Sequence, residues 1–280
     1  MPSLPDPYPR YLRLLGIDGV PGGLPGLRAV VRQHLLRVPF ENISKLCLFG
    51  REGAGRFPTL TEFLDRIEYQ DLGGTCHSNN PFLAGLLRAL GYDVDLLGAD
   101  MGPRSNCHTC LRVRIEGLAY HVDVGYGGPF REPMRLDRLP LEVVEGTRRY
   151  VLDWNANEGR YEMALFSGEE RVHGYIINEQ PRTVDFFMPN LQISFGPTAA
   201  FLNCIRICRF FDGHSFELLN RNLSVSRGAK AIQTELVTAA EWRDTVANHL
   251  AMPRCPWAEA LRVLEQVTGK PFFEERAAQV

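Results

Sequence analysis

Two β-forming runs joined by a short turn lie near the middle of the chain, where residues 108–124 read HTCLRVRIEGLAYHVDV. Apolar and polar residues alternate over residues 111–115 and 120–124, which predicts two strands. Glu116 and Gly117 between them suit a two-residue hairpin turn, although Asn-Gly is the more favoured pair. The sequence therefore predicts an antiparallel hairpin at the centre of the fold.

The register of this hairpin brings two ionisable side chains to one face. The turn pairs Ile115 with Leu118 and hence Cys110 with Asp123. His108 and Asp123 are then diagonal neighbours, with backbones about 7–8 Å apart and side chains within reach of each other. A slip of one residue would place them on opposite faces. The pattern allows a carboxylate to orient an imidazole, as a triad of nucleophile, base and acid requires.

Further strand-like runs surround the hairpin, and helical patterns precede and follow it. The other strand-like runs are residues 94–97, 149–154, 161–166, 172–178, 215–219 and 223–226. The helical patterns are residues 27–38, 59–69, 81–90 and 256–267, with another opening at residue 238. This order predicts an α+β protein with a helical region 1–91, an antiparallel sheet or β-barrel region 92–196 and a mixed region 197–280.

A glycine-rich turn ahead of a helical segment presents a candidate nucleophile. Residues 71–80 read DLGGTCHSNN, so Cys76 follows two glycines. A thiol at a helix N-terminus has a lowered pKa, and the free backbone N–H groups there can bind an oxyanion. A buried structural thiol after a flexible turn is the alternative interpretation. With His108 as base and Asp123 as its orienter, Cys76 completes a candidate catalytic triad.

Six other histidines compete with His108 for the role of base. His77 follows the thiol but is expected to point away from it on the helix. His121 is expected to face the other side of the sheet from the triad carboxylate. His34 falls on an apolar helical stripe and is interpreted as a satisfied core residue. The remaining three have no motif around them: His173, His214 and His249.

The triad acid continues directly into a glycine-rich run, GYGG, at residues 125–128. Glycines on both sides of Tyr126 allow a flat ligand to approach, with the aromatic ring as one wall. Alone this run is also an ordinary turn. Joined to Asp123, it predicts that Tyr126 and Gly127 line a substrate pocket.

Composition excludes several classes of protein. The 280 residues carry a formal charge of -2, without the basic footprint of nucleic-acid binding. No run approaches the ~18 apolar residues of a membrane span, and no signal-peptide pattern follows Met1. Seven cysteines, an odd number, are typical of free thiols in a reducing compartment. We therefore expect a cytoplasmic enzyme without nucleic-acid or membrane partners.

Four cysteines invite a zinc interpretation, which the predicted elements disfavour. Cys107 and Cys110 have the spacing of a zinc-binding pair, with Cys204 and Cys208 as further ligands. However, a strand directs the first pair to opposite faces, and the second pair has helical spacing suited to core packing. We expect no metal.

Taken together, these motifs resemble the arylamine N-acetyltransferase family over nearly the whole chain. Residues 38–42, VPFEN, are similar to the family's Pro-Phe-Glu-Asn segment. Residues 73–76, GGTC, with Asn80 resemble its nucleophile motif. Residues 122–127, VDVGYG, resemble its Asp-Val-Gly-aromatic-Gly segment, and His108 lies fifteen residues before the acid.

The resemblance implies a helical N-terminal domain (1–91), a central antiparallel β-barrel (92–196) and a C-terminal α/β lid (197–280), around a transglutaminase-like Cys-His-Asp core. It implies a ping-pong reaction, in which Cys76 takes an acetyl group from acetyl-CoA and passes it to an arylamine, arylhydrazine or N-hydroxyarylamine. The residues that it places in the acceptor pocket are Phe40, Tyr126 and Gly127. It predicts neither the CoA-contacting residues nor the oligomeric state.

The chain also departs from the family pattern. Leu72 stands where the family has Arg, and Ser78 stands where it has an acid, so we expect Glu41 to lack its customary cationic neighbour. Pro81 is expected to shift the start of the helix behind Cys76. The rival functions are an amide synthase of the same family, another transglutaminase-like cysteine enzyme such as a protease, and a non-catalytic binding protein.

Overall fold

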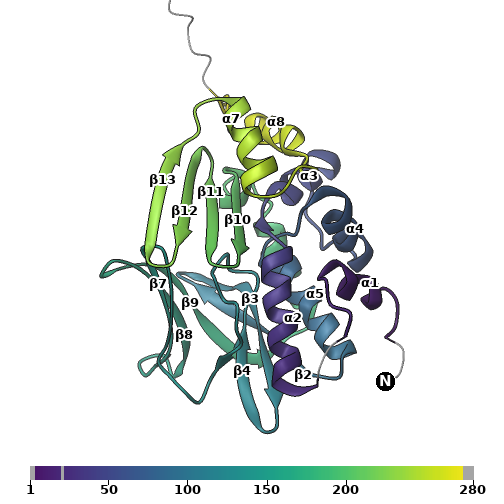
Figure 1. The fold of residues 1–280 in the computed structure, drawn as a ribbon, viewed down its shortest axis with the longest axis vertical. Coiled ribbons are helices and arrows are strands. Elements are labelled where there is room, and N and C mark those ends of the chain that lie inside the picture. The colour runs from purple at the N-terminus through teal and green to yellow at the C-terminus, as the bar shows by residue number, and fades with distance from the viewer. Residues whose placement is uncertain (1–3, 20–21, 274–280) are drawn as a thin grey trace, which may run out of the picture.

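The computed structural model describes residues 4–19 and 22–273 (Figure 1). Its α-helices are α1(Tyr8–Leu14), α2(Gly23–Arg37), α3(Ile43–Glu52), α4(Leu60–Gln70), α5(Cys76–Ala89), α6(Met188–Ile193), α7(Ala239–Asp244) and α8(Trp257–Thr268). Short turns of other helical type are η1(Val184–Phe187), η2(Ala200–Leu202) and the π-helical η3(Thr245–His249).

The strands form two antiparallel sheets. The larger sheet has the order β5(Met134–Arg135), β4(Leu118–Val122), β3(Arg104–Ile115), β2(Asp93–Met101), β9(Glu170–Pro181), β8(Arg160–Ser167), β7(Arg148–Asn155) and β6(Leu141–Glu145). The smaller has the order β1(Phe40–Glu41), β10(Arg206–Phe211), β11(His214–Leu219), β12(Asn222–Arg227) and β13(Lys230–Glu235). Figure 1 shows the smaller sheet above the larger, with α1–α5 along one side and α7 and α8 beside the smaller sheet.

The predicted α+β class with a barrel-like antiparallel sheet is confirmed, with one change in the N-terminal region. The first ninety residues are not wholly helical, because β1 pairs with β10 through Phe40 opposite Cys208. The N-terminal region therefore supplies an edge strand to the C-terminal sheet. The proposed boundaries at residues 91 and 196 remain a prediction.

The central hairpin has the predicted register. Ile115 lies opposite Leu118, and the ladder continues to Leu111 opposite Val122. Both turn residues, Glu116 and Gly117, have positive φ angles, 51° and 79°, as a type I′ turn requires. Strand β4 ends at Val122, so the expected pair of Cys110 with Asp123 lies just beyond the ladder.

Helix α5 begins at Cys76, and Pro81 lies inside it. The expectation that Pro81 shifts the helix start is therefore wrong. An internal proline removes one backbone hydrogen bond, but tertiary bonds hold this helix to the sheet. The Thr109 hydroxyl donates to the Cys76 carbonyl at 2.8 Å, and the Asn80 amide donates to the Thr109 carbonyl at 2.5 Å. These tertiary contacts outweigh the unfavourable helix propensity of Pro81.

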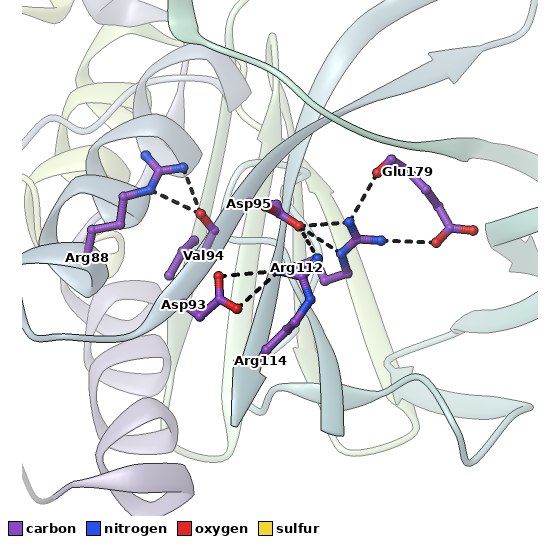
Figure 2. Close-up of polar contacts among 7 residues, drawn as sticks. All are labelled: Arg88, Asp93, Val94, Asp95, Arg112, Arg114 and Glu179. Atoms are coloured by element: carbon purple, nitrogen blue, oxygen red, sulfur yellow. Dashed lines mark hydrogen bonds and ion pairs between the residues drawn. The ribbon is translucent and has the colours of Figure 1, made fainter. Parts of the chain in front are cut away.

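An ion-pair ladder on the outer part of the larger sheet reinforces the same register (Figure 2). Asp93 lies opposite Arg114 and Asp95 lies opposite Arg112 in the β2–β3 ladder. Arg112 donates to Asp95 at 2.7 Å and to Glu179 of β9 at 3.0 Å. Because oppositely charged residues face each other across the strands, a one-residue slip would separate every pair.

Among the described residues, three large apolar clusters and a small one around Phe40 hold the elements together. One joins α1, α2, α4 and α5 to β2–β4 and includes Tyr11 and Phe63. A second lies between the smaller sheet and α3, α7 and α8, around Leu218 and Trp242. The third fills the barrel-like sheet around Tyr175. Within residues 4–19 and 22–273, no helix combines the length and apolar character needed to traverse a bilayer.

Candidate active site

Cys76 is the first residue of α5 and is held there by the segment around β1. The Gly73 N–H donates to the Glu41 carboxylate at 3.2 Å, and the Glu41 N–H donates to the Gly74 carbonyl at 3.2 Å. A Cβ on Gly73 would lie 2.2 Å from the Pro39 carbonyl oxygen. Only glycine allows the two segments to approach this closely.

His108 and Asp123 form the predicted pair. Nε2 of His108 lies 2.7 Å from Oδ2 of Asp123, and both side chains are almost fully buried. The other carboxylate oxygen, Oδ1, accepts hydrogen bonds from the Asn80 amide at 2.9 Å and the Gly125 N–H at 2.8 Å. The carboxylate is thus fixed on both sides, and Nδ1 of His108 remains as the ring nitrogen available to a thiol.

The structure brings Cys76 next to this pair. A Cβ on Gly125, two residues beyond Asp123, would lie 2.6 Å from the Cys76 Cα. Burial raises the pKa of the Cys76 thiol, but the charges of His77 and His108 and their hydrogen bonds to the thiol hold it well below its usual value. Burial lowers the pKa of His108, but the Asp123 charge and hydrogen bond, and then Cys76, raise it overall. These shifts favour a thiolate beside an imidazolium.

Helix geometry adds an oxyanion site at the same place. The first N–H groups of a helix have no intrahelical partner, and the N-cap residue Thr75 supplies no side-chain cap. The N–H groups at Cys76 and His77 are therefore available to an acyl oxygen bound at the sulfur.

Two histidines differ from their sequence expectations. His77 does not point away from the thiol, since its charge lowers the pKa of Cys76 and its side chain lines the same cavity. His121 does not face away from Asp123, because the Tyr175 hydroxyl contacts both side chains. Nε2 of His121 lies 2.9 Å from the Tyr175 hydroxyl, which itself donates to Oδ2 of Asp123 at 2.8 Å. The hydroxyl proton of Tyr175 takes part in the bond to Asp123. The Nε2–H of His121 therefore donates to the Tyr175 oxygen.

His34 is a core residue, as predicted, but it is not satisfied. It is fully buried, and neither ring nitrogen has a hydrogen-bond partner among the described residues. Burial lowers its pKa to about 3, so it is neutral near pH 7.

A cavity of about 800 Å³ opens onto the Cys76 thiol. Its lining includes all three residues predicted for the substrate pocket: Phe40, Tyr126 and Gly127. Gly127 has a φ of +78°, and a Cβ there would lie 3.1 Å from the Phe40 ring and 3.2 Å from the Cys208 sulfur. The Tyr126 hydroxyl lies 2.7 Å from Nδ1 of His173.

Sequence reasoning missed several residues of this site. Tyr175 supports the acid, and the cavity wall contains residues with no motif around them: Lys45, Arg104, Arg148, Tyr150, His173 and Arg206. They come from α3 and from strands of both sheets. No local sequence pattern indicates that residues so far apart along the chain line one cavity. Asn80 was named as part of the nucleophile motif, but its hydrogen bonds to Asp123 and Thr109 were not predicted.

The departures from the family pattern are accommodated by other residues. Leu72 is buried in the cluster under the smaller sheet. Burial raises the pKa of Glu41, while bonds from the Ser44 N–H and the charge of Arg66 lower it in part. Among the described residues no cation forms an ion pair with Glu41, and the charge of Arg66 on α4 acts on it from a greater distance.

The cysteines considered for zinc binding lie apart in the fold. Cys110 is in the core of the larger sheet, whereas Cys107 and Cys204 line the cavity. Cys208 belongs to β10, so the helical interpretation of its spacing from Cys204 is wrong. Over residues 4–19 and 22–273, no group of three or more His, Cys, Asp or Glu side chains is arranged to hold a metal ion.

An N-acetyltransferase family model matches residues 23–253. Among curated proteins, an arylamine N-acetyltransferase of Mycolicibacterium smegmatis is 27% identical over 256 residues, covering 86% of this chain and 90% of its own length.

Solved structures share the fold. A variant of the Mycobacterium smegmatis N-arylamine acetyltransferase superposes with a TM-score of 0.75 at 25% identity, over 91% of this chain and 98% of its own. The Mycobacterium marinum arylamine N-acetyltransferase, solved in complex with CoA, superposes with a TM-score of 0.76 at 22% identity, over 93% and 99% of the two chains.

Proposed function

The chain belongs to the arylamine N-acetyltransferase family, and we propose that it transfers acetyl groups from acetyl-CoA to arylamines, arylhydrazines or N-hydroxyarylamines. Cys76 is the nucleophile, His108 the base and Asp123 the orienter. The observation that carries the proposal is a thiol of lowered pKa beside a buried His–Asp pair, at the wall of an 800 Å³ cavity.

In the first half-reaction the Cys76 thiolate attacks the acetyl carbonyl of acetyl-CoA. A new bond forms from Sγ to the carbonyl carbon, the bond to the CoA sulfur breaks, and the proton on His108 passes to the departing CoA thiolate. The backbone N–H groups at the start of α5 stabilise the tetrahedral oxyanion. Asp123 keeps the imidazole in the orientation that directs Nδ1 toward the sulfur.

In the second half-reaction the amine attacks the acetyl-thioester. The amine nitrogen bonds to the acetyl carbon, His108 takes the amine proton, and Cys76 leaves as the thiolate. Phe40, Tyr126 and Gly127 form the wall against which a flat acceptor packs. Because CoA leaves before the amine reacts, the kinetics are ping-pong.

Mass spectrometry of the intact protein after mixing with acetyl-CoA tests the proposal. We expect an adduct of about 42 Da on Cys76, absent from Cys76→Ala and removed by an arylamine. Thiol reactivity without this adduct would instead support the amide synthase or another transglutaminase-like enzyme. Iodoacetamide labelling of Cys76 at the rate of an ordinary thiol would support a binding protein.

Three further proposals concern the whole chain. We propose the domains 1–91, 92–196 and 197–280, which the succession of helices, large sheet and small sheet supports. We propose a cytoplasmic location, which seven free cysteines support. We also propose that acetyl-CoA and small aromatic amines or hydrazines are its partners, without nucleic acid.

A further inference from the structure

Lys45 is a buried cation that the acetyl transfer described above does not use. It lies on α3, is 8% exposed and lines the same cavity as Cys76. Its Nζ donates to the Ser194 hydroxyl at 2.6 Å and lies 4.2 Å from the centre of the Phe195 ring. Ser194 in turn donates to the Leu191 carbonyl at 2.6 Å. The ammonium is therefore held in place by neutral groups.

No carboxylate among the described residues compensates this charge. Burial lowers the pKa of Lys45 to about 8, and the only group that raises it is the Cys76 thiolate. Buried charges are normally paired, because desolvation of an isolated ion is costly. When Cys76 is acylated and its thiolate charge is lost, an anionic group on a bound substrate can pair with Lys45.

The surroundings of Lys45 also favour an anion. The described residues that line the main cavity include three arginines and no Asp or Glu: Arg104, Arg148 and Arg206. A smaller cavity of about 30 Å³ on the other side of Lys45 is lined by Arg56, Arg66 and His77, again without a carboxylate. The arginines do not all add to the charge of Lys45, because Arg148 and Arg206 pair with Glu217. Arg56 is likewise paired with Glu52 and Glu62. Arg104 has no ion pair among the described residues, so Lys45 and Arg104 are the cations that can attract a negative group into the main cavity.

The phosphates of CoA do not fit this position. When an acyl group is transferred to Cys76, the CoA sulfur lies at the reacting carbon, and the whole pantetheine arm separates it from the nearest phosphate. An anion that reaches Lys45, which is close enough to Cys76 for their charges to interact, must therefore belong to the acyl group or to the acceptor amine.

We propose that Lys45 forms a subsite for a carboxylate carried by one of the two groups that meet at Cys76, the acyl chain or the acceptor. This inference rests on the proposed function. It makes the enzyme selective for a dicarboxylic acyl thioester in the first half-reaction or for an aminobenzoate-type acceptor in the second. The carboxylate forms an ion pair with Nζ, which Ser194 and the Phe195 ring hold in position.

The two half-reactions allow the two sources to be tested separately. In the first, single-turnover release of CoA is measured with acetyl-CoA and with succinyl-CoA. In the second, the acetylated enzyme is mixed with 4-aminobenzoate or with its neutral methyl ester. The variant is Lys45→Met, which keeps the length of the side chain without its charge, and the matched control is Lys230→Met on the exposed strand β13.

We expect Lys45→Met to lower kcat/KM by about tenfold or more for the carboxylated substrate of one pair, which is either succinyl-CoA or 4-aminobenzoate. This is the scale of a lost charged hydrogen bond. The neutral member of the pair loses less, so the ratio of kcat/KM for the carboxylated substrate to that for the neutral substrate falls, whereas Lys230→Met changes this ratio by less than about twofold. Ser194→Ala, which leaves the ammonium but removes its anchor, changes selectivity in the same direction by a smaller factor, and it serves if Lys45→Met does not fold.

Two outcomes would overturn the inference. One is a wild-type enzyme that does not distinguish the carboxylated and neutral members in either half-reaction. The other is a Lys45→Met variant that loses activity equally with all four substrates, since a uniform loss indicates a role in thiolate stabilisation or folding. Failure of acetyl-CoA to acylate wild-type Cys76 would count against the proposed function. The selectivity for succinyl-CoA would still be read from CoA release and from the mass of the adduct.

Discussion

Strand β3 carries two ionic networks with similar contact distances and very different surroundings. Near one end, His108 lies 2.7 Å from Asp123, and both side chains are at most 1% exposed. Toward the other end, Arg112 and Arg114 contact Asp95 at 2.7 and 2.6 Å, and Arg114 contacts Asp93 at 3.3 Å (Figure 2). In this second network Arg114 is 39% and Asp93 63% exposed.

The difference shows that distance alone does not determine what an ion pair contributes. Water and salt screen the exposed pairs, so each contributes little beyond fixing the register. The buried pair is unscreened, and the loss of either partner leaves an uncompensated group in the interior. The exposed network is therefore suited to aligning the strands, and the buried pair is suited to chemistry.

The largest effect is expected from breaking the buried pair with Asp123→Asn. The amide cannot hold a charged His108 or its tautomer, so we expect kcat to fall by about 10³- to 10⁴-fold. Initial rates of arylamine acetylation measure the loss, and circular dichroism checks the fold. A fall of less than tenfold in a folded variant would show that Asp123 does not orient the base.

A second test uses the pH dependence of the thiol. Because His77 and His108 lower the pKa of Cys76, the thiolate is present below the range in which ordinary thiols titrate. Iodoacetamide should therefore label Cys76 rapidly at pH 6, and His108→Gln should slow labelling at that pH by about tenfold or more. The two proteins should converge near pH 9. Equal rates at pH 6 would contradict the lowered pKa.

A smaller effect is expected at Tyr175, which links the buried pair to His121. Tyr175→Phe removes the hydrogen bond to Oδ2 of Asp123 and leaves Nε2 of His121 without its acceptor. We expect kcat/KM to fall by about tenfold, the scale of one lost bond to a charged group. Tyr161→Phe, on the neighbouring strand β8, is the control. An unchanged pH profile of kcat in Tyr175→Phe would indicate a purely structural role.

The smallest effect is expected in the exposed network. Arg114→Ala should lower the free energy of unfolding by less than about 1 kcal/mol and leave acetylation unchanged. Urea unfolding of the single variants and of Arg114→Ala with Asp93→Ala measures the coupling between them. A coupling well above that value, or one that persists in 1 M salt, would mean that burial does not separate the two networks.

Elements that depend on residues close together in the sequence were predicted correctly, and elements that depend on distant residues were missed. The hairpin, its turn and the helix at residues 59–69 were predictable because they depend on residues close in sequence. The structure contains all three, and Thr59 and Glu62 form a capping box at the start of this helix. Strands β5, β6, β10 and β13 were not predicted. Strand β1 was also missed, since two residues acquire a strand only through pairing with β10.

The candidate site divides in the same way. Cys76, His108 and Asp123 could be named from glycine spacing, strand alternation and family resemblance. The error at His121 came from applying that alternation wrongly, and the error at His77 came from treating the first helical turn as if side chains there had fixed directions. The influence of Arg66 on Glu41 depends on how α4 packs, which no local pattern contains.

By itself, the sequence determined the class of fold, the register of the central hairpin and the three residues proposed for the chemistry, because short-range backbone geometry and residue type suffice for these. Only the tertiary structure decided what surrounds them. The support of Asp123 by Asn80 and Tyr175, the uncompensated charge of Lys45 and the cationic cavity all arise from segments distant along the chain. Burial and electrostatic potential are sums over such neighbours, and the neighbours exist only after the chain has folded.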